Sequence, residues 1–155
     1  MAKTNTIPFP QNITPINATI VNATSFTAAN PGTAPTNTIL VTTAGANDSI
    51  IKRLTVASTD TSAATIQWWK SPDGGTTKYL IGITVIAALS GAATLINVDV
   101  LGNATITGLS LDETGKPVLM MSANGGTPEK LYACVITSAV TASKNLYITG
   151  EQVDY

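Results

Sequence analysis

Histidine is absent from this 155-residue chain, and cysteine occurs once. Without histidine, the chain can form neither a Ser-His-Asp triad nor a Cys-His pair, and it has no imidazole to bind a metal ion. One cysteine cannot make an intrachain disulfide or a cysteine-rich zinc site. Cys134 alternates with Tyr132 and Ile136 in a strand-like run, which is typical of a small buried hydrophobic residue.

Charge is also scarce. Charged residues make up 11% of the chain, with a formal net charge of −1, against about 25% in ordinary globular domains. No charged residue lies between Lys3 and Asp48, and 26 threonines supply much of the polarity. Clustered Lys and Arg are needed to bind nucleic acid, so we expect no nucleic-acid partner. A weakly charged surface associates easily, which indicates contact with another protein. A bias of the source genome would give the same composition.

No segment resembles a signal peptide or a membrane helix. Residues 1–10 lack a continuous apolar core, so they do not form a secretory signal. The uncharged stretch 79–98 is long enough to span a bilayer. However, Gly82 and Asn97 interrupt it, and residues 88–92 form a turn sequence between two β-branched runs. We therefore expect no membrane contact.

Proline divides the chain into two parts. Residues 1–36 contain five of the eight prolines, and proline favours extended backbone while lacking the donor that a central strand needs. This part is interpreted as an extended arm, with one edge strand near Ile16–Ala23. Residues 37–155 are interpreted as one domain.

The second part is a series of short strands separated by turn sequences. Strands are expected at residues 38–44, 50–58, 64–70, 77–86, 94–101, 117–122, 130–138 and 146–152. Their spacing of about ten residues predicts an all-β fold, an antiparallel β-sandwich or barrel. The only helical turn that the pattern allows is near Gly108–Glu113.

The polar residues offer no catalytic constellation. A glycosidase needs a pair of carboxylates, but five acidic residues sit in turn sequences, where local hydrogen bonding explains them. No acidic cluster has the spacing of a calcium loop, and no glycine-rich segment has that of a phosphate loop. We expect no catalytic residue, metal or cofactor.

Trp68 and Trp69 point to opposite faces of their expected strand, because successive strand residues alternate. Trp68 shares a face with Ile66 and is assigned to the core. Trp69 lies beside Thr65 and Gln67 on the polar face. There it can anchor a protein interface, stack on a sugar, or pack beneath a second layer.

The order of segments from residue 38 resembles that of small bacteriophage capsid decoration, or cement, proteins with a jelly-roll-like β-sandwich. The similar segments are LVTTAGANDS at 40–49 followed by IIKRLTV at 50–56, ATIQWW at 64–69 with the DGG hairpin at 73–75, ITVIAALSG at 83–91, and the terminal GEQVDY at 150–155. The resemblance lies in pattern and order, and none of these segments carries chemistry.

The resemblance implies a non-enzymatic virion protein, made in the host cytoplasm, that binds the outer surface of the assembled head. Its expected partners are the major capsid protein, whose neighbouring subunits it clamps, and further copies of itself in a homotrimer. The alternative is a carbohydrate-recognition module in a phage tail or receptor-binding protein. The candidate interface residues are Ile7, Pro8, Phe9, Pro10, Ile13 and Ile16 in the arm, together with Trp69.

Overall fold

The computed structural model describes residues 12–21, 37–89, 95–103, 105–136 and 140–155. These residues form ten strands and one short 3-10 turn. The strands are β1 (Asn12–Val21), β2 (Ile39–Thr43), β3 (Ser49–Ser58), β4 (Ala64–Ser71), β5 (Tyr79–Ile86), β6 (Ile96–Asp99), β7 (Leu109–Leu111), β8 (Pro117–Met121), β9 (Lys130–Ile136) and β10 (Asn145–Asp154), and the turn is at Asn124–Gly126.

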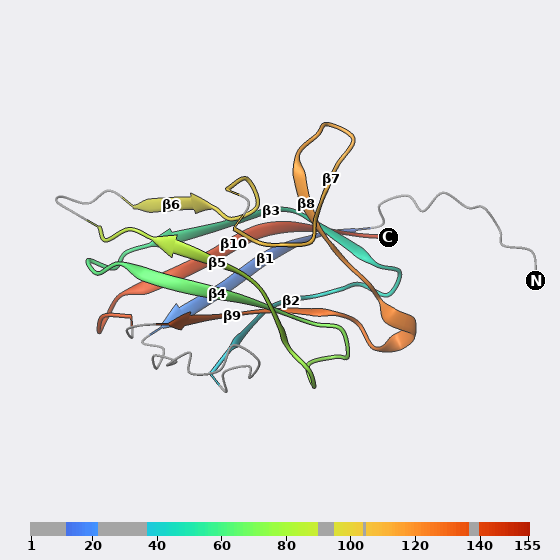
Figure 1. Ribbon diagram of the computed structural model, residues 1–155, viewed down its shortest axis with the longest axis horizontal. Coiled ribbons are helices and arrows are strands. Elements are labelled where there is room, and N and C mark those ends of the chain that lie inside the picture. The colour runs from blue at the N-terminus through green and yellow to red at the C-terminus, as the bar shows by residue number, and fades with distance from the viewer. Residues whose placement is uncertain (1–11, 22–36, 90–94, 104, 137–139) are drawn as a thin grey trace, which may run out of the picture.

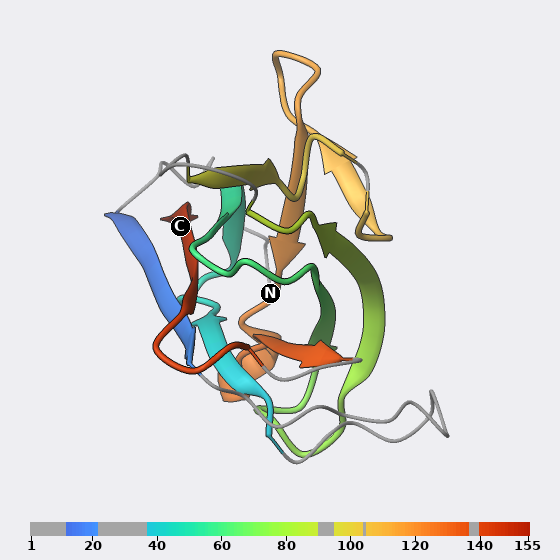
Figure 2. The ribbon, with the colours of Figure 1, turned by 90° about the vertical axis from the view of Figure 1, so that its left-hand side faces the viewer.

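The strands form two antiparallel sheets that pack face to face (Figures 1 and 2). The first sheet, sheet A, has the order β1-β10-β3-β8-β7, and β6 pairs with the other half of β3. The second, sheet B, has the order β2-β9-β4-β5. The prediction of an all-β antiparallel sandwich is confirmed.

The core lies between the sheets. Ile51, Leu54 and Val56 enter it from sheet A, and Ile66 and Trp68 enter it from sheet B. Trp68 is fully buried, as the sequence predicted, and its indole Nε1 donates to Thr84 Oγ1 at 2.8 Å. This bond meets the requirement that a buried polar group find a partner.

A β-bulge changes which residues of β3 face the core. The register between β3 and β10 shifts between Glu151 and Gln152. In the sequence, unbroken alternation would place Ile50 on the same side as Leu54 and Val56, but the structure buries Ile51 completely and leaves Ile50 partly exposed on the outer face. A bulge inserts one residue and so reverses the alternation beyond it.

The segment near Gly108–Glu113 is not helical, so that expectation was wrong. Leu109–Leu111 is strand β7, which pairs with β8 in a hairpin that projects from sheet A (Figures 1 and 2). The carboxylate of Asp112 closes the hairpin by accepting from the backbone N–H groups of Thr114 and Lys116. This local bonding holds the chain in a turn.

The described part of the predicted arm is a strand of the sandwich. β1 pairs with β10 in continuous register from Asn12 to Val21, so it begins before the expected edge strand at Ile16–Ala23 and ends earlier. Ile16 and Ile20 are 2% and 1% exposed and belong to the core. The remaining arm residues, 1–11 and 22–36, lie outside the described residues.

Candidate protein-interaction surface

Four apolar side chains line up across the outer face of sheet A. Ile13 in β1 is opposite Val153 in β10, Val153 is opposite Ile50 in β3, and Ile50 is opposite Met120 in β8. Directly opposed residues of antiparallel strands lie on the same face. Ile13 is 64% exposed and Met120 is 52% exposed. Val153, in the middle of the row, is 3% exposed and Ile50 is partly exposed. The row is therefore apolar across four strands, and it is most open to solvent at its two ends, Ile13 and Met120.

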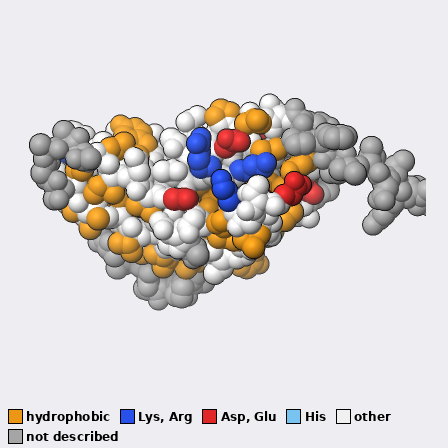
Figure 3. Space-filling model, turned by 90° about the horizontal axis from the view of Figure 1, so that it is seen from above, with side chains coloured by type: hydrophobic (Ala, Val, Ile, Leu, Met, Phe, Trp, Pro, Cys, Tyr) orange, Lys and Arg blue, Asp and Glu red, His pale blue; other side chains and the backbone are white. Residues whose placement is uncertain are grey.

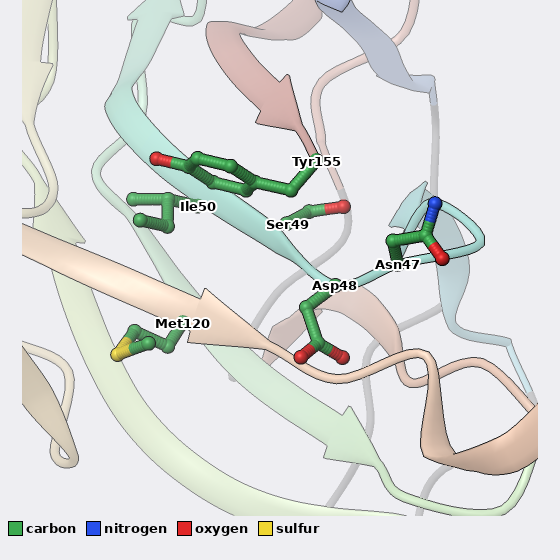
Figure 4. Close-up of a pocket in the computed structure, with 6 residues that line it drawn as sticks. All are labelled: Asn47, Asp48, Ser49, Ile50, Met120 and Tyr155. Carbon is green, nitrogen blue, oxygen red and sulfur yellow. The ribbon is translucent and has the colours of Figure 1, made fainter. Parts of the chain in front are cut away.

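Tyr155 completes this row at the end of β10. Its backbone N–H donates to the carbonyl oxygen of Asp48 at 3.2 Å, and its ring lies beside Ile50 (Figure 4). A pocket of about 240 Å³ opens here, lined by Asn47, Asp48, Ser49, Ile50, Met120 and Tyr155. We call Ile13, Ile50, Met120 and Tyr155 the apolar patch.

Asp48 fixes the rim of the pocket. Its backbone φ is 75°, a left-handed conformation that Asp tolerates better than most residues. Its Oδ1 accepts hydrogen bonds from the Ala123 N–H at 2.6 Å and from Ser122 Oγ at 3.0 Å. The turn before β3 is thereby bonded to the chain that follows β8. The two strands that carry Ile50 and Met120 are held at a fixed separation.

Lys70, in the opposite sheet, bonds to the backbone of Met120 and forms an ion pair with Glu129. Lys70 Nζ, at the end of β4, donates to the Met120 carbonyl oxygen at 3.0 Å and lies 2.7 Å from Glu129 Oε2. The same Glu129 oxygen accepts from the Ser122 N–H at 2.8 Å. Sheet B thus braces the edge of the apolar patch through polar bonds, which leaves the Met120 side chain free to face outward.

A polar network supports the patch from beneath. Asp154 Oδ1 accepts from Ser49 Oγ at 2.6 Å and from Gln152 Nε2 at 2.7 Å, and its Oδ2 accepts from Thr14 Oγ1 at 2.9 Å. Gln152 Oε1 accepts from Thr42 Oγ1 at 2.7 Å. The network joins strands β1, β2, β3 and β10, so the backbone under the patch is rigidly connected.

The pKa of Asp154 reflects two opposing effects. Burial of the carboxyl raises its pKa, but the hydrogen bonds from Ser49, Gln152 and Thr14 favour the ionised form more strongly. The net result is a pKa below the ordinary value of 3.8. Asp154 is therefore a charged acceptor at neutral pH, and its role is to hold strands together.

Charged side chains lie next to the apolar patch on the same face. Glu151 in β10 is opposite Arg53 in β3, one row along from the patch, and Lys52 is the adjacent exposed residue. Figure 3 shows basic and acidic side chains gathered in the middle of this face, with hydrophobic side chains around them. An apolar area bordered by charge is the usual composition of a protein-binding surface.

The other described aspartates also accept bonds from turns. Asp60 accepts from the Ser62 N–H and from both the N–H and Oγ1 of Thr141. Burial raises the pKa of Asp60, but these hydrogen bonds lower it by more, so the net shift of its pKa is downward. At Asp73, hydrogen bonds from Thr77 lower the pKa to about 2. These carboxylates stabilise loop geometry in their ionised form.

The outer face of sheet B contains a second, smaller apolar cluster of Trp69, Cys134 and Ile136, with Leu80 and Tyr132 packed against it. Trp69 is 1% exposed. This burial corrects the assignment of Trp69 as an interface anchor or sugar platform, because both roles need an exposed ring. The packing alternative accounts for its position. Burial also raises the pKa of Cys134 to about 11.

The remaining candidate interface residues have different outcomes. Ile13 is exposed in the apolar patch, as an interface residue must be. Ile16 points into the core, so its assignment to an interface is wrong. Ile13 and Ile16 are three positions apart in β1, and residues an odd number of positions apart in a strand lie on opposite faces of the sheet. Ile7, Pro8, Phe9 and Pro10 lie outside the described residues. The sequence analysis missed Met120 and Tyr155, whose proximity depends on the pairing of β8, β3 and β10.

Comparison of the chain with protein-family models, with curated proteins and with solved structures finds no match. Within the described ranges, no three His, Cys, Asp or Glu side chains come together as a metal site. In the same ranges, no helix has the length and hydropathy to cross a membrane.

Proposed function

We propose that this chain is a non-enzymatic structural protein of a phage virion. In this proposal it is a capsid decoration, or cement, protein that binds the outer surface of the assembled head and clamps neighbouring major capsid subunits. The apolar patch on sheet A is the surface that contacts the capsid. Association of the chain with itself as a homotrimer is part of the same proposal.

The observation that carries the proposal is the position of the apolar patch. It lies across four strands of a sheet, where side chains have fixed directions, and it is braced from below by the Asp154 network and from the side by Lys70. A rigid apolar surface loses little entropy on binding. Clamping a shell requires a stiff, adhesive surface of this kind.

The carbohydrate-binding alternative has lost its main support. It depended on an exposed Trp69 ring, on which a sugar could stack. With Trp69 1% exposed, that platform is not available on the described surface. We therefore retain protein binding as the proposed role of the chain.

A binding experiment tests the proposal directly. Heads are purified from a mutant of the encoding virus that lacks this gene, and the purified chain is added back over a range of concentrations. We expect saturable binding with many copies per head, and heads that withstand heating better once they are covered. Met120→Asp should weaken this binding at least tenfold, because it buries a charge in the apolar contact.

Val85→Asp is the matched control. Val85 is 67% exposed, but it lies on the outer face of sheet B. It should bind heads as the unchanged chain does. The proposal fails if the purified chain does not bind the heads, or if Met120→Asp and Val85→Asp bind equally well. Only a few copies per particle, located on the tail, would favour the receptor-binding alternative.

A further inference from the structure

Strand β1 is a long sheet edge. It pairs with β10 on one side over all ten of its residues, and no other described strand pairs with its second side. Its sequence, NITPINATIV, contains no charged residue. Proteins usually protect such edges with lysine or with short strands. β1 carries one protective feature, Pro15, and is otherwise a template for another strand.

The backbone bonds of β3 establish which residues of β1 face this open side. The Leu54 carbonyl accepts from Val100 N–H at 2.9 Å, on the side of β3 away from β10. Its opposite residue, Gly150, therefore directs its own backbone groups away from β3 and toward Ile16 of β1. The direction of the backbone N–H and C=O groups alternates along a strand. The backbone groups of Pro15 and Asn17 therefore face the open side of β1.

A second bond gives the same result at the other end of β1. The Asn145 carbonyl accepts from Thr59 N–H at 3.1 Å, so Asn145 faces the β3 side. Val21, its opposite residue, must then face outward. The outward backbone groups of β1 therefore belong to its odd-numbered residues. Because Pro15 directs its backbone away from β10, its missing N–H removes no hydrogen bond between β1 and β10. This is the position expected of proline in an edge strand.

We propose that the β1 edges of two copies of this chain pair antiparallel about a two-fold axis at Asn17, which joins their A sheets into one. In this register Ile13 of one copy lies opposite Val21 of the other. These residues are 64% and 59% exposed in the single chain and lie on the same face of β1. Cross-strand pairs of β-branched side chains stabilise antiparallel sheets, so this register brings the two exposed side chains into contact. Pro15 lies opposite Thr19 of the other copy, and this pair forms one hydrogen bond, from the Thr19 N–H to the Pro15 carbonyl oxygen, instead of two.

The inference does not depend on the capsid role, because it concerns the chain alone. A two-fold pair is also distinct from a trimer contact: each β1 edge is used once and the assembly closes at two copies. Copies that form trimers through other surfaces can still be joined in pairs through β1.

The remaining described edges suit this role less well. On β5, the Ile83 N–H donates to the Thr105 carbonyl at 3.0 Å and the Thr107 N–H donates to the Ile81 carbonyl at 2.6 Å, so that edge is occupied. β2 has five residues and an interrupted register, and β7 has three. Among the described strands, β1 offers the longest free edge.

Cysteine crosslinking tests the register. In the proposed pair, the two Asn17 Cα atoms are about 5.5 Å apart, which is within the range of a disulfide. Asn17→Cys should form a covalent dimer under mild oxidation. In the control, Thr19→Cys, the two sulfurs lie about 13 Å apart along the strands, so little crosslinking is expected. Cys134 is buried in both variants.

Sedimentation velocity across a range of concentrations tests the hydrogen bonds. Thr19→Pro removes an outward N–H without disturbing the bonds to β10, so the sandwich should keep its circular dichroism and thermal midpoint. It should raise the dissociation constant of the pair at least tenfold. Thr19→Val, which keeps the N–H and the β-branched shape, should associate as the unchanged chain does.

Specific crosslinking at Asn17, together with loss of association in Thr19→Pro, supports the proposed pairing of two β1 edges. A chain that stays monomeric at every concentration overturns it, as does an oligomer that Thr19→Pro leaves unchanged. Crosslinking through Thr19→Cys in preference to Asn17→Cys overturns the register. Ile13 belongs to both the apolar patch and the proposed pair, but Met120 lies on β8, which β10 and β3 separate from β1. Head binding measured with Met120→Asp and self-association measured with Thr19→Pro therefore report on different contacts.

Discussion

Thr14 Oγ1 donates to Asp154 Oδ2 at 2.9 Å across 140 positions of sequence. Through this bond the first described strand and the last are linked on the inner side of sheet A, directly beneath the apolar patch. The bond belongs to the network in which Asp154 also accepts from Ser49 and Gln152. Asp154 is therefore the residue at which β1, β3 and β10 meet.

Replacing Asp154 by alanine should lower the free energy of unfolding by about 1–3 kcal/mol, because the buried donors of Ser49 and Gln152 would lose their charged acceptor. Urea denaturation followed by circular dichroism measures the change. Glu113→Ala, on the exposed β7–β8 hairpin, should alter stability by no more than about 0.5 kcal/mol. Equal midpoints for the two variants would refute the structural role of Asp154.

Stability should depend on pH in the acid range. Asp60, Asp112 and Asp154 have pKa values below 3.8, and that of Asp73 is about 2. The folded state therefore binds protons less readily than the unfolded state. The stabilisation is fully present above about pH 5, declines as the unfolded carboxyls take up protons around their ordinary pKa of 3.8, and is lost as the pH falls toward 2.

Thermal midpoints measured between pH 8 and pH 2 test this dependence. We expect a plateau between pH 8 and 5, because no histidine titrates there, and a fall below pH 4. Asp73→Asn removes the group with the pKa of about 2 and should make the fall between pH 3 and pH 2 shallower. A constant midpoint down to pH 2 would contradict the assigned hydrogen bonds.

The sequence was enough to predict the sandwich, because alternation and turn residues are local signals. The expected strands at 50–58 and 64–70 differ from β3 and β4 by one residue at an end. The faces were harder to predict. The bulge opposite β10 turns Ile51 to the core and Ile50 to the outer face. A second register shift, between Trp68 and Trp69, places Ile81 against the core, while Leu80 packs with Trp69 on the outer face of sheet B. Bulges depend on the partner strand, which local sequence does not specify.

The candidate surface was less accessible to prediction than the fold. Ile13 was identified, but Met120 and Tyr155 join it through pairings between residues far apart in sequence. The polar face assigned to Trp69 was misleading for a physical reason. Gln67 and Thr65 made the face look solvated, yet Gln67 is 3% exposed and Trp69 packs with Cys134 beside it.

Cys134 should be protected from thiol reagents in the folded state. Burial raises the pKa of its thiol to about 11, and the thiolate is the reactive form. Labelling with a disulfide reagent at pH 8 should be at least a hundredfold slower for the native chain than for the chain in denaturing urea. Rapid native labelling would show that the cluster of Trp69 and Cys134 opens to solvent.

Thr84→Val should leave the Trp68 indole N–H without its acceptor in the core. Thr84 Oγ1 accepts from Trp68 Nε1 at 2.8 Å and lies 2.7 Å from Thr105 Oγ1. A buried donor that loses its partner costs about 1–3 kcal/mol. Thr84→Ser, which keeps the hydroxyl, should recover much of this loss. Equal urea midpoints for the two variants would show that the hydroxyl is not needed.

Gly82→Ala should open the protected edge of β5. The backbone of Thr105 and Ile106 passes so close to Gly82 that an added Cβ would overlap the Thr105 carbonyl. Relief of that overlap requires the 105–107 segment to move away, which breaks its bonds to Ile81 and Ile83. An unpaired edge then carries the exposed side chains of Ile83 and Val85, a combination that favours aggregation. We expect a lower thermal midpoint and concentration-dependent light scattering.

Gly115→Ala is the control for a glycine replacement, because Gly115 has open space around its Cβ position and only its φ of 79° opposes the change. It should destabilise the hairpin locally without scattering, and aggregation of both variants alike would remove the special role of the β5 edge.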